Sequence, residues 1–286
     1  MWHCDMRLVC RALSGCGPRL TAAVLVGLLG CRSDPEPPRA TPKSEVPAAV
    51  SAASAVAAPS AAAVPPVTQM RIEPLSGNMG LVIVAPNETI KGRASLITGM
   101  IDLDLADVTR TRGSIGVDLT TLKMSSFGDP AKDKKQSDHA QAWLEIVGDV
   151  APSFKERYRY ATFAIREVVA IGEHRVDKWP STKGPDGEVR TAAVTVKGDL
   201  GVHGKSVAKE IPMVAILTFR TGETIPIKLE MRSTAPMTVT LAQHDIAPKD
   251  LPGMAAKGLL GKRVGETAEL SIGFLATPAP KAMPAE

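Results

Sequence analysis

Histidine and cysteine are the residue types in this chain whose side chains could act in acid–base, nucleophilic or metal chemistry near neutral pH. The five histidines are His3, His139, His174, His203 and His244. They show neither the HxH nor the HExxH spacing of a metal site, and no serine stands in a GxSxG nucleophile elbow. We therefore expect no catalytic residue, no metal ligand and no enzymatic activity. His203 is interpreted as a partly exposed residue at a turn.

The cysteines are confined to the first 31 residues, at Cys4, Cys10, Cys16 and Cys31. The rest of the chain therefore has no thiol for a disulfide, a cysteine zinc site or a redox pair. Three arginines (Arg7, Arg11, Arg19) precede the apolar run 20–30, which is too short to span a bilayer as a helix. The run ends in LLGC, which resembles the lipobox of bacterial lipoproteins and makes Cys31 the expected lipidation site.

Two alternatives to lipidation at Cys31 stay open. A second lipobox-like tetrapeptide ends at Cys16, although Arg7 and Arg11 interrupt the apolar segment before it. The segment can also be read as a plain secretion signal or an uncleaved anchor. In each case the chain is exported. Because Arg32 rather than an aspartate follows Cys31, we expect attachment to the outer membrane, on its periplasmic side.

The expected organisation is a signal peptide at 1–30, a linker at 31–70, a barrel domain at 71–278 and a disordered tail at 279–286. The linker is rich in Pro, Ala and Ser, and its prolines interrupt every helical window, so it reads as a disordered, extended tether. The whole chain carries a formal net charge of +4 and has a pI near 8.9. This excess is too small for a nucleic-acid-binding protein, so we expect no nucleic-acid partner.

Beyond residue 70, apolar residues alternate with polar ones, which is typical of half-buried strands. Strands are predicted at 81–84, 97–105, 115–119, 163–171, 194–202, 211–217, 225–231, 237–241 and 268–274. One helix is predicted at 136–147, with Ala140, Trp143, Leu144 and Val147 on one face, after a charged loop at 128–138. Consecutive strands without intervening helices indicate an all-β antiparallel fold, either a barrel or a sandwich.

Two hairpins are predicted from turn residues. Residues 184–187 (GPDG) read as one turn, and residues 194–217 (VTVKGDLGVHGKSVAKEIPMVAIL) contain the other. A two-residue turn at Gly204-Lys205 would place Asp199 opposite Glu210, which is unfavourable. A four-residue turn at 204–207 separates these acids, and it is the preferred register.

The segment 196–207 (VKGDLGVHGKSV) resembles a glycine-rich hairpin of the YceI-like family, periplasmic lipocalin-like proteins that bind polyprenyl chains. Further similar segments follow in the same order, at 113–122, 138–139, 160–163, 241–248 and 264–266, and departures include Tyr160 and Ser137. The resemblance covers roughly residues 75–276. It implies an eight-stranded lipocalin-like barrel with one short inserted helix. It also implies that no cofactor is bound beyond a polyprenyl lipid or quinone.

The expected function is that of a lipid-anchored carrier or store for an isoprenoid or another long apolar lipid. The membrane is the second expected partner, through lipidated Cys31. The expected ligand-lining residues are Ile101, Leu103, Ile115, Val117, Phe163, Ile165, Val196, Leu200, Met213, Leu217, Leu229, Val239, Leu241 and Leu270. The same alternation would also suit a solid core, so the alternative is a structural scaffold without a ligand. The carrier hypothesis requires an elongated hollow inside the barrel.

Overall fold

The strands of the described chain belong to one antiparallel sheet of thirteen strands. The computed structural model describes residues 67–85, 88–247 and 265–280. The strands are β1 (Thr68–Ile72), β2 (Asn78–Val84), β3 (Thr89–Ala94), β4 (Ile97–Leu103), β5 (Arg112–Asp118), β6 (Lys123–Met124), β7 (Tyr160–Ala170), β8 (Ser181–Gly184), β9 (Gly187–Val202), β10 (Lys205–Phe219), β11 (Pro226–Ser233), β12 (Met237–Thr240) and β13 (Thr267–Pro278). The helices are α1 (Pro130–Trp143) and α2 (Pro152–Tyr158), with 3-10 turns η1 (Val108–Arg110), η2 (Leu119–Thr121), η3 (Val176–Lys178) and η4 (Leu241–His244).

A closed ring of eight strands forms the barrel. It runs β1-β4-β5-β7-β9-β10-β11-β13, and it closes because Met70, Arg71 and Ile72 of β1 pair with the end of β13. Inward-facing aliphatic side chains on successive strands fill one continuous core. The predicted all-β, eight-stranded antiparallel, lipocalin-like barrel is confirmed.

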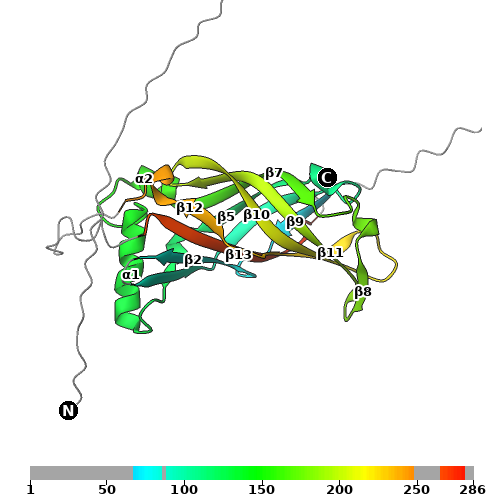
Figure 1. Ribbon diagram of the computed structural model, residues 1–286, viewed down its shortest axis with the longest axis horizontal. Coiled ribbons are helices and arrows are strands. Elements are labelled where there is room, and N and C mark those ends of the chain that lie inside the picture. Colours follow the sequence, from blue (N-terminus) through cyan, green and yellow to red (C-terminus); the bar gives the residue numbers. More distant parts are fainter. Residues whose placement is uncertain (1–66, 86–87, 248–264, 281–286) are drawn as a thin grey trace, which may run out of the picture. The chain divides into compact units, whose positions relative to one another are not determined.

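Strand β13 joins the ring to a smaller extension of the sheet. Its second half pairs with β11 and β1 in the ring, and its first half pairs with β12 and β2. From β2 the sheet continues through β3 to the two-residue strand β6. Figure 1 shows α1 standing across this end of the barrel, whereas β8 lies at the other end. The barrel therefore has a helical end and an opposite end with different coverings.

Each predicted strand run corresponds to an observed strand, but four strands were not predicted. β1, β3, β6 and β8 are short or polar, so they lack the long alternating runs that predicted the others. The predicted turn at 184–187 is confirmed, because Gly184 pairs with Gly187 across the β8–β9 hairpin. β1 begins at Thr68, ahead of the expected domain start at residue 71, and β13 ends at Pro278.

The predictions for helices were wrong in number and position. There are two helices, and α1 runs from Pro130 to Trp143 instead of over 136–147. The oxygen Oδ1 of Asp129 accepts hydrogen bonds from the backbone N–H groups of Ala131 and Lys132, and Pro130 occupies the first helical turn. These are standard features of a helix start. The stretch 128–138, predicted as a loop, is therefore mainly helical despite its charge.

The alternation in β7 changes phase at a β-bulge. Ala161, Phe163 and Ile165 are buried, and the register against β9 then shifts between Ile165 and Glu167. Beyond the bulge Val168 and Ala170 point inward, and Ile171, which an uninterrupted alternation from Phe163 would place on the inner face, is exposed. A bulge adds one residue to one strand and so reverses which side chains face the core.

Neither predicted register of the β9–β10 hairpin is correct. Val202 pairs with Lys205, so the turn consists of His203 and Gly204, whose φ angles are 51° and 73°. Positive φ at both central residues is the geometry of a type I′ turn, which matches the twist of the flanking strands. In this register Glu210 lies opposite Lys197, a pairing of opposite charges that neither predicted register provides.

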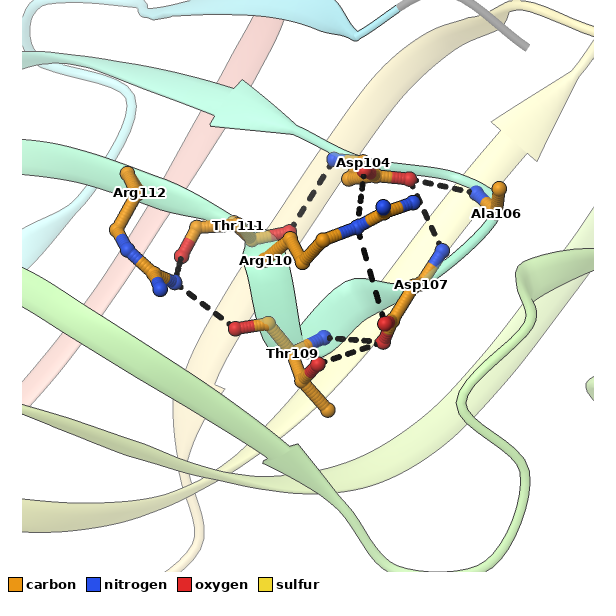
Figure 2. Close-up of polar contacts among 7 residues, drawn as sticks. All are labelled: Asp104, Ala106, Asp107, Thr109, Arg110, Thr111 and Arg112. Atoms are coloured by element: carbon orange, nitrogen blue, oxygen red, sulfur yellow. Dashed lines mark hydrogen bonds and ion pairs between the residues drawn. The ribbon is translucent and has the colours of Figure 1, made fainter. Parts of the chain in front are cut away.

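A polar network supports the β4–η1–β5 connection (Figure 2). The carboxylate of buried Asp104 accepts hydrogen bonds from the N–H groups of Ala106 and Asp107, both at 2.9 Å. The same carboxylate forms an ion pair with Arg110 at 2.9 Å. The carboxylate of Asp107 accepts hydrogen bonds from the N–H and the hydroxyl of Thr109. These bonds lower the pKa of Asp107, and the bond from the hydroxyl is the largest cause. These bonds fix Val108 and the following turn over the end of the barrel.

Next to this turn, apolar side chains fill the barrel end. Val108 and Val176 are fully buried, and Trp179 is 5% exposed while its indole N–H donates to the carbonyl oxygen of Glu173 at 2.9 Å. The backbone N–H of Val176 donates to the carbonyl oxygen of Leu105, which ties η3 to the end of β4. The end of the barrel away from α1 is therefore closed by packed side chains.

The expected signal peptide, the lipidation site Cys31 and most of the expected linker lie outside the described residues. Among the helices that are described, none has both the length and the apolar character needed to cross a bilayer.

Candidate functional site: an apolar pocket beside helix α1

A large apolar pocket lies at the helical end of the barrel. Its volume is about 420 Å³, within the range of about 300–1,000 Å³ that small-molecule sites occupy. Its walls come mainly from β2, β13 and α1, with one residue each from β3, β6, β7, β9 and β12. Exposed side chains of α1 belong to its lining, so the pocket opens to solvent beside this helix.

The sheet side of the pocket consists of aliphatic side chains. Because side chains alternate along each strand, Met79, Leu81 and Ile83 of β2 face the same space, and so do Ala268 and Leu270 of β13. This wall is formed by Met79, Leu81, Ile83, Ile90, Met124, Ala161, Val202, Val239, Ala268 and Leu270, and Leu119, Leu122, Leu241 and Ile246 extend it from the adjoining turns. Such a surface offers no hydrogen bond to a ligand, but it removes hydrocarbon from water, which contributes about 0.8 kcal/mol for each buried methylene.

Helix α1 forms the other wall, and its pocket-facing residues change in character along the helix. The pocket-facing residues are Lys132, Lys135, Gln136, His139, Ala140, Trp143 and Leu144, the last of which follows the helix end. Their spacing of three and four places them on one helix face. The first two turns contribute charged and polar groups, and the last turn contributes apolar ones. The helix therefore presents a polar-to-apolar gradient along its axis.

Hydrogen bonds hold α1 against the sheet extension. The hydroxyl of Ser137 accepts from the backbone N–H of Met124 at 2.8 Å and donates to the carbonyl oxygen of Asp133 at 2.7 Å. The side-chain amide of Gln141 donates to the carbonyl oxygens of Thr120 and Leu122 at 3.0 and 3.1 Å. These bonds join α1 to β6 and η2, so the helical wall is fixed relative to the strands that it faces.

An ion pair between buried Asp118 and the partly exposed Arg159 positions η2 beside the pocket. Oδ2 of Asp118 accepts two hydrogen bonds from the guanidinium of Arg159, at 3.0 and 2.7 Å, and Oδ1 accepts from the N–H and hydroxyl of Thr120. Burial alone would raise the pKa of Asp118, but the Arg159 and Thr120 hydrogen bonds together outweigh it and lower this pKa below its ordinary value. The charged carboxylate thus caps η2, whose Leu119 lines the pocket.

His139 lies at the mouth of the pocket. Its ring is partly buried, and this desolvation is the main reason that its pKa lies below the ordinary value of 6.5. The positive charge of nearby Lys135 lowers the pKa further, whereas Asp138 raises it. His139 is therefore predominantly neutral at pH 7, and the charged groups in the lining are Lys132, Lys135 and Glu88.

The structure divides the predicted lining residues between this pocket and two small voids. Val239, Leu241 and Leu270 line the pocket. Eight others surround a void of about 40 Å³ deeper in the barrel: Ile101, Leu103, Ile115, Ile165, Val196, Met213, Leu217 and Leu229. Val117, Phe163 and Leu200 line a second void of about 40 Å³, together with Ile115 and Leu270. All fourteen face the interior, but most of them pack against one another.

The expected elongated hollow is therefore confined mainly to the helical half of the barrel. Trp179, Phe274 and Met231 fill the space around the first void, and Phe163 takes up space beside the second. Each void holds about one water-sized volume or little more. The interior is hollow next to α1 and nearly solid beyond it.

Most of the residues that line the pocket were not predicted from the sequence. Those of β3 and β6 lie in strands that were not predicted, and Lys132, Lys135 and Gln136 lie in the segment predicted as a loop. A usable signal was present on the helix, because Ala140, Trp143 and Leu144 were predicted on one apolar face. Such a face must pack against something, and here it forms part of the pocket wall.

His203 lies in a contact network at the turn of the β9–β10 hairpin. Its Nδ1 lies 3.1 Å from the carbonyl oxygen of His244, its Nε2 lies 3.3 Å from Oε2 of Glu145, and its ring packs on Tyr158 of α2 with 4.1 Å between centroids. The predicted position at a turn is confirmed, but the side chain is only 9% exposed instead of partly solvated. His203 thus joins the hairpin to both helical segments.

His244 is buried completely and differs from the other histidines in its surroundings. One ring nitrogen, Nδ1, lies 3.3 Å from the carbonyl oxygen of Val202, and Nε2 has no hydrogen-bond partner among the described residues. Burial is the main cause that lowers the pKa of this ring, so the neutral form is favoured. Within the described ranges, no group of three or more His, Cys, Asp or Glu side chains is placed to hold a metal ion.

Comparison with known proteins gives no matching family model and no matching curated protein. Solved structures with a similar fold include Burkholderia cenocepacia BcnA, with 12% identity, a TM-score of 0.46, and coverage of 72% of this chain and 99% of that chain. A polyisoprenoid-binding domain from Saccharophagus degradans, implicated in plant cell wall breakdown, has 11% identity, a TM-score of 0.46, and coverage of 74% and 99%.

A mutant CJ YceI protein with a monobromobimane guest is also similar, with 14% identity, a TM-score of 0.37, and coverage of 66% of this chain and 84% of that chain. The last of these bears the YceI name. The likeness of this chain to these three structures is one of fold.

Proposed function

We propose that this protein binds a single apolar lipid tail in the pocket beside α1 and serves as an exported, lipid-anchored carrier or store for that lipid. The observation that carries the proposal is the pocket itself, about 420 Å³ of space whose sheet side is aliphatic. An aliphatic cavity of this size favours hydrocarbon over water, because water would find too few hydrogen-bond partners there. Anchoring through Cys31, export and an outer-membrane location are parts of the proposal that rest on the sequence.

The volume of the pocket limits the length of the tail. A cavity of about 150 Å³ accommodates benzene, so a pocket of about 420 Å³ holds roughly 17 carbon atoms. This corresponds to three or four isoprene units, or to a common fatty acyl chain. A longer polyprenyl chain would have to extend out of the mouth, since the inner half of the barrel is packed.

Burial of such a tail supplies enough free energy for binding. At about 0.8 kcal/mol per methylene, ten buried methylene equivalents contribute about 8 kcal/mol. Association and ordering of the ligand cost about 4 kcal/mol or more, which offsets part of this gain. Binding in the micromolar range or tighter therefore requires most of the pocket to be filled, which favours tails close to the limit of length.

Extraction of the purified full chain with organic solvent, followed by mass spectrometry, tests this function. We expect a co-purified lipid with a tail of about 15–20 carbons. Native mass spectrometry of the same sample then measures whether the lipid is bound in a one-to-one complex. Repeated empty extracts, together with no binding of added geranylgeraniol, would overturn the proposal.

The alternative is a structural scaffold without a ligand. It is favoured by the packing of eleven of the fourteen predicted lining residues around voids of only about 40 Å³. The same experiment separates the two functions, because a scaffold would bind no added lipid whatever its tail length. The prediction that the protein is not an enzyme stays a prediction.

A further inference from the structure

We infer that the ligand is an amphiphile with an anionic headgroup, which the ammonium groups of Lys132 and Lys135 bind at the mouth of the pocket. This inference rests on the proposed function and extends it from the tail to the headgroup. The headgroup chemistry is that of a phosphate or carboxylate. The ligand class is therefore a single-tailed lipid acid or lipid phosphate instead of a neutral quinone or alcohol.

The axial gradient along α1 matches the polarity of such a molecule. An apolar tail inside the barrel would pass Leu144, Trp143 and Ala140, and its polar end would then reach His139 and Gln136. A ligand without a polar head would offer no polar group to the side chains at the first turns of α1. The order of residues along one helix face thus sets the direction in which an amphiphile enters, with the tail inward and the headgroup at the first turns of α1.

The charge on this helix face is positive and is not neutralised within the described chain. Lys134, on another face of α1, forms an ion pair with Asp138 at 2.7 Å. In contrast, neither Lys132 nor Lys135 forms an ion pair among the described residues, although both line the pocket. Their aliphatic stems can cover the apolar wall while the ammonium groups stay at the water boundary.

Glu88 is the one carboxylate in the lining of the pocket, and it reduces the charge of the mouth. With two lysines, one glutamate and a predominantly neutral His139, the mouth carries a net charge of about +1 at pH 7. Asp133 and Asp138 are engaged elsewhere, with the N–H of Phe127 and with Lys134. An anion gains from both lysines, whereas a cation would have only Glu88 as a partner.

The test compares two ligands that share one tail and differ only in the headgroup. Geranylgeranyl phosphate and geranylgeraniol are added together, at equal concentration, to the purified full chain, and native mass spectrometry measures the ratio of the two complexes. Because exposed ion pairs contribute modestly, we expect about a tenfold preference for the phosphate at low ionic strength. The preference should shrink at 0.5 M salt, where exposed charges are screened.

Three variants connect this preference to the mouth of the pocket. In the double variant Lys132→Gln, Lys135→Gln the ratio should fall close to one, and in Glu88→Gln it should rise. Lys134→Gln is the matched control, because this lysine lies on α1 but not in the pocket, and its ratio should equal that of the unmodified protein. A ratio that stays at tenfold in the double variant would overturn the inference.

The outcomes separate the headgroup from the tail. Equal binding of both ligands by the unmodified protein would overturn the anionic headgroup while leaving the proposed function in place. If neither ligand binds, the proposed function fails and the headgroup inference fails with it. Inorganic phosphate alone, added as a competitor at the same concentration, should displace neither ligand, and displacement by it would show a free-anion site instead of a lipid site.

Discussion

Nε2 of His203, in the turn of the β9–β10 hairpin, lies 3.3 Å from Oε2 of Glu145, just beyond the C-terminal end of α1. Both contacts of the imidazole are with acceptor oxygens, the carboxylate of Glu145 and the carbonyl of His244. The doubly protonated ring can donate to both at once, whereas a neutral tautomer can donate to only one. This contact links two walls of the helical end, since β9 and α1 both contribute residues to the pocket.

Replacement of His203 by asparagine should destabilise the fold without disturbing the turn. Asparagine tolerates the positive φ of 51° at this position, so the type I′ geometry is kept. The contact with Glu145 and the packing on Tyr158 are lost, and we expect the free energy of unfolding to fall by about 1 kcal/mol. Urea denaturation measures this change. An unchanged midpoint would show that the contact contributes nothing to stability.

Acidification should destabilise the protein between pH 7 and pH 5 because of His244. The pKa of its buried ring is below 6.5, so as the pH falls the unfolded chain takes up a proton before the folded one does. The contribution of the neutral His244 ring to the free energy of unfolding is present above pH 6.5. Below pH 6.5 the free energy of unfolding declines by at most about 1.4 kcal/mol per pH unit because of this group. Thermal unfolding as a function of pH measures the effect.

His244→Leu tests the origin of this acid sensitivity. The variant should show a smaller loss of melting temperature from pH 7 to pH 5, even though its stability at pH 7 is reduced by loss of the hydrogen bond with Val202. His174→Leu, at an exposed histidine, is the control for substitution by itself. The interpretation is wrong if His244→Leu is as acid-sensitive as the unmodified protein.

Asp118 should stabilise the fold through its charged form. Its pKa is lowered in the folded state, so its contribution is present above the ordinary value of 3.8 and is lost as the pH falls through the lower folded value. Asp118→Asn keeps acceptor capacity for Thr120 but loses the charged contact with Arg159, and we expect a loss of about 2 kcal/mol at pH 7. The difference from the unmodified protein should shrink as the pH falls below 3.8 in acid unfolding experiments.

Gly198 allows β7 and β9 to approach closely, and alanine should not be tolerated there. A Cβ atom at this position would lie 2.3 Å from the carbonyl oxygen of Ala164 and 2.8 Å from the ring of Phe163. We expect Gly198→Ala to cost about 2 kcal/mol, because the strand and the ring must both move. At Gly116 the nearest atom, Oγ1 of Thr98, is 3.5 Å away, so Gly116→Ala is the matched control with little expected effect.

Seven of the eight strands that form the ring could be predicted from the sequence, because burial on one face imposes a period of two on each of them, whereas the five-residue strand β1 is too short to show a long alternating run. The sequence did not show where a bulge or a turn changes which side chains of a strand face the core. The bulge after Ile165 and the turn at His203-Gly204 each depend on pairing with a neighbouring strand, which single-strand periodicity does not contain. The fold class was therefore accessible, and the exact registers were not.

The site was harder to predict than the fold, because alternation shows which side chains face inward but not how completely they fill the space. Leu217 and Leu270 have the same pattern in the sequence, yet one packs around a void of about 40 Å³ and the other lines the pocket. The difference arises from Trp179 and its neighbours at one end and from the position of α1 at the other. Both are properties of the assembled barrel.

Filling the pocket from α1 should abolish lipid binding without unfolding the protein. Ala140 faces the pocket, so the ring of Ala140→Phe can enter existing space instead of displacing packed atoms. We expect binding of geranylgeraniol to fall at least tenfold while the melting temperature is kept or raised. Ala131→Phe, at an exposed position of the same helix, is the control and should bind normally. Undiminished binding by Ala140→Phe would place the lipid elsewhere.

If the proposed lipid tail occupies the pocket, Leu270 should limit its length, because this side chain lines both the pocket and an adjacent void of about 40 Å³. Leu270→Ala removes three carbon atoms from this boundary and joins the two spaces. On the scale of about 150 Å³ for a six-carbon ring, the void adds room for one or two carbons, so the pocket gains roughly five carbons, or one isoprene unit.

Leu270→Ala should both destabilise the fold and change the preferred tail length. Deletion of buried atoms should lower the free energy of unfolding by about 2 kcal/mol, and the best-bound prenyl alcohol should lengthen from about four isoprene units to about five. Competition among prenyl alcohols of 10 to 25 carbons, measured by native mass spectrometry, gives the preferred length for both proteins. If Leu270→Ala is destabilised but keeps the original preference, Leu270 supports the fold without forming the end of the ligand site, and the tail must lie along β2 and α1 alone.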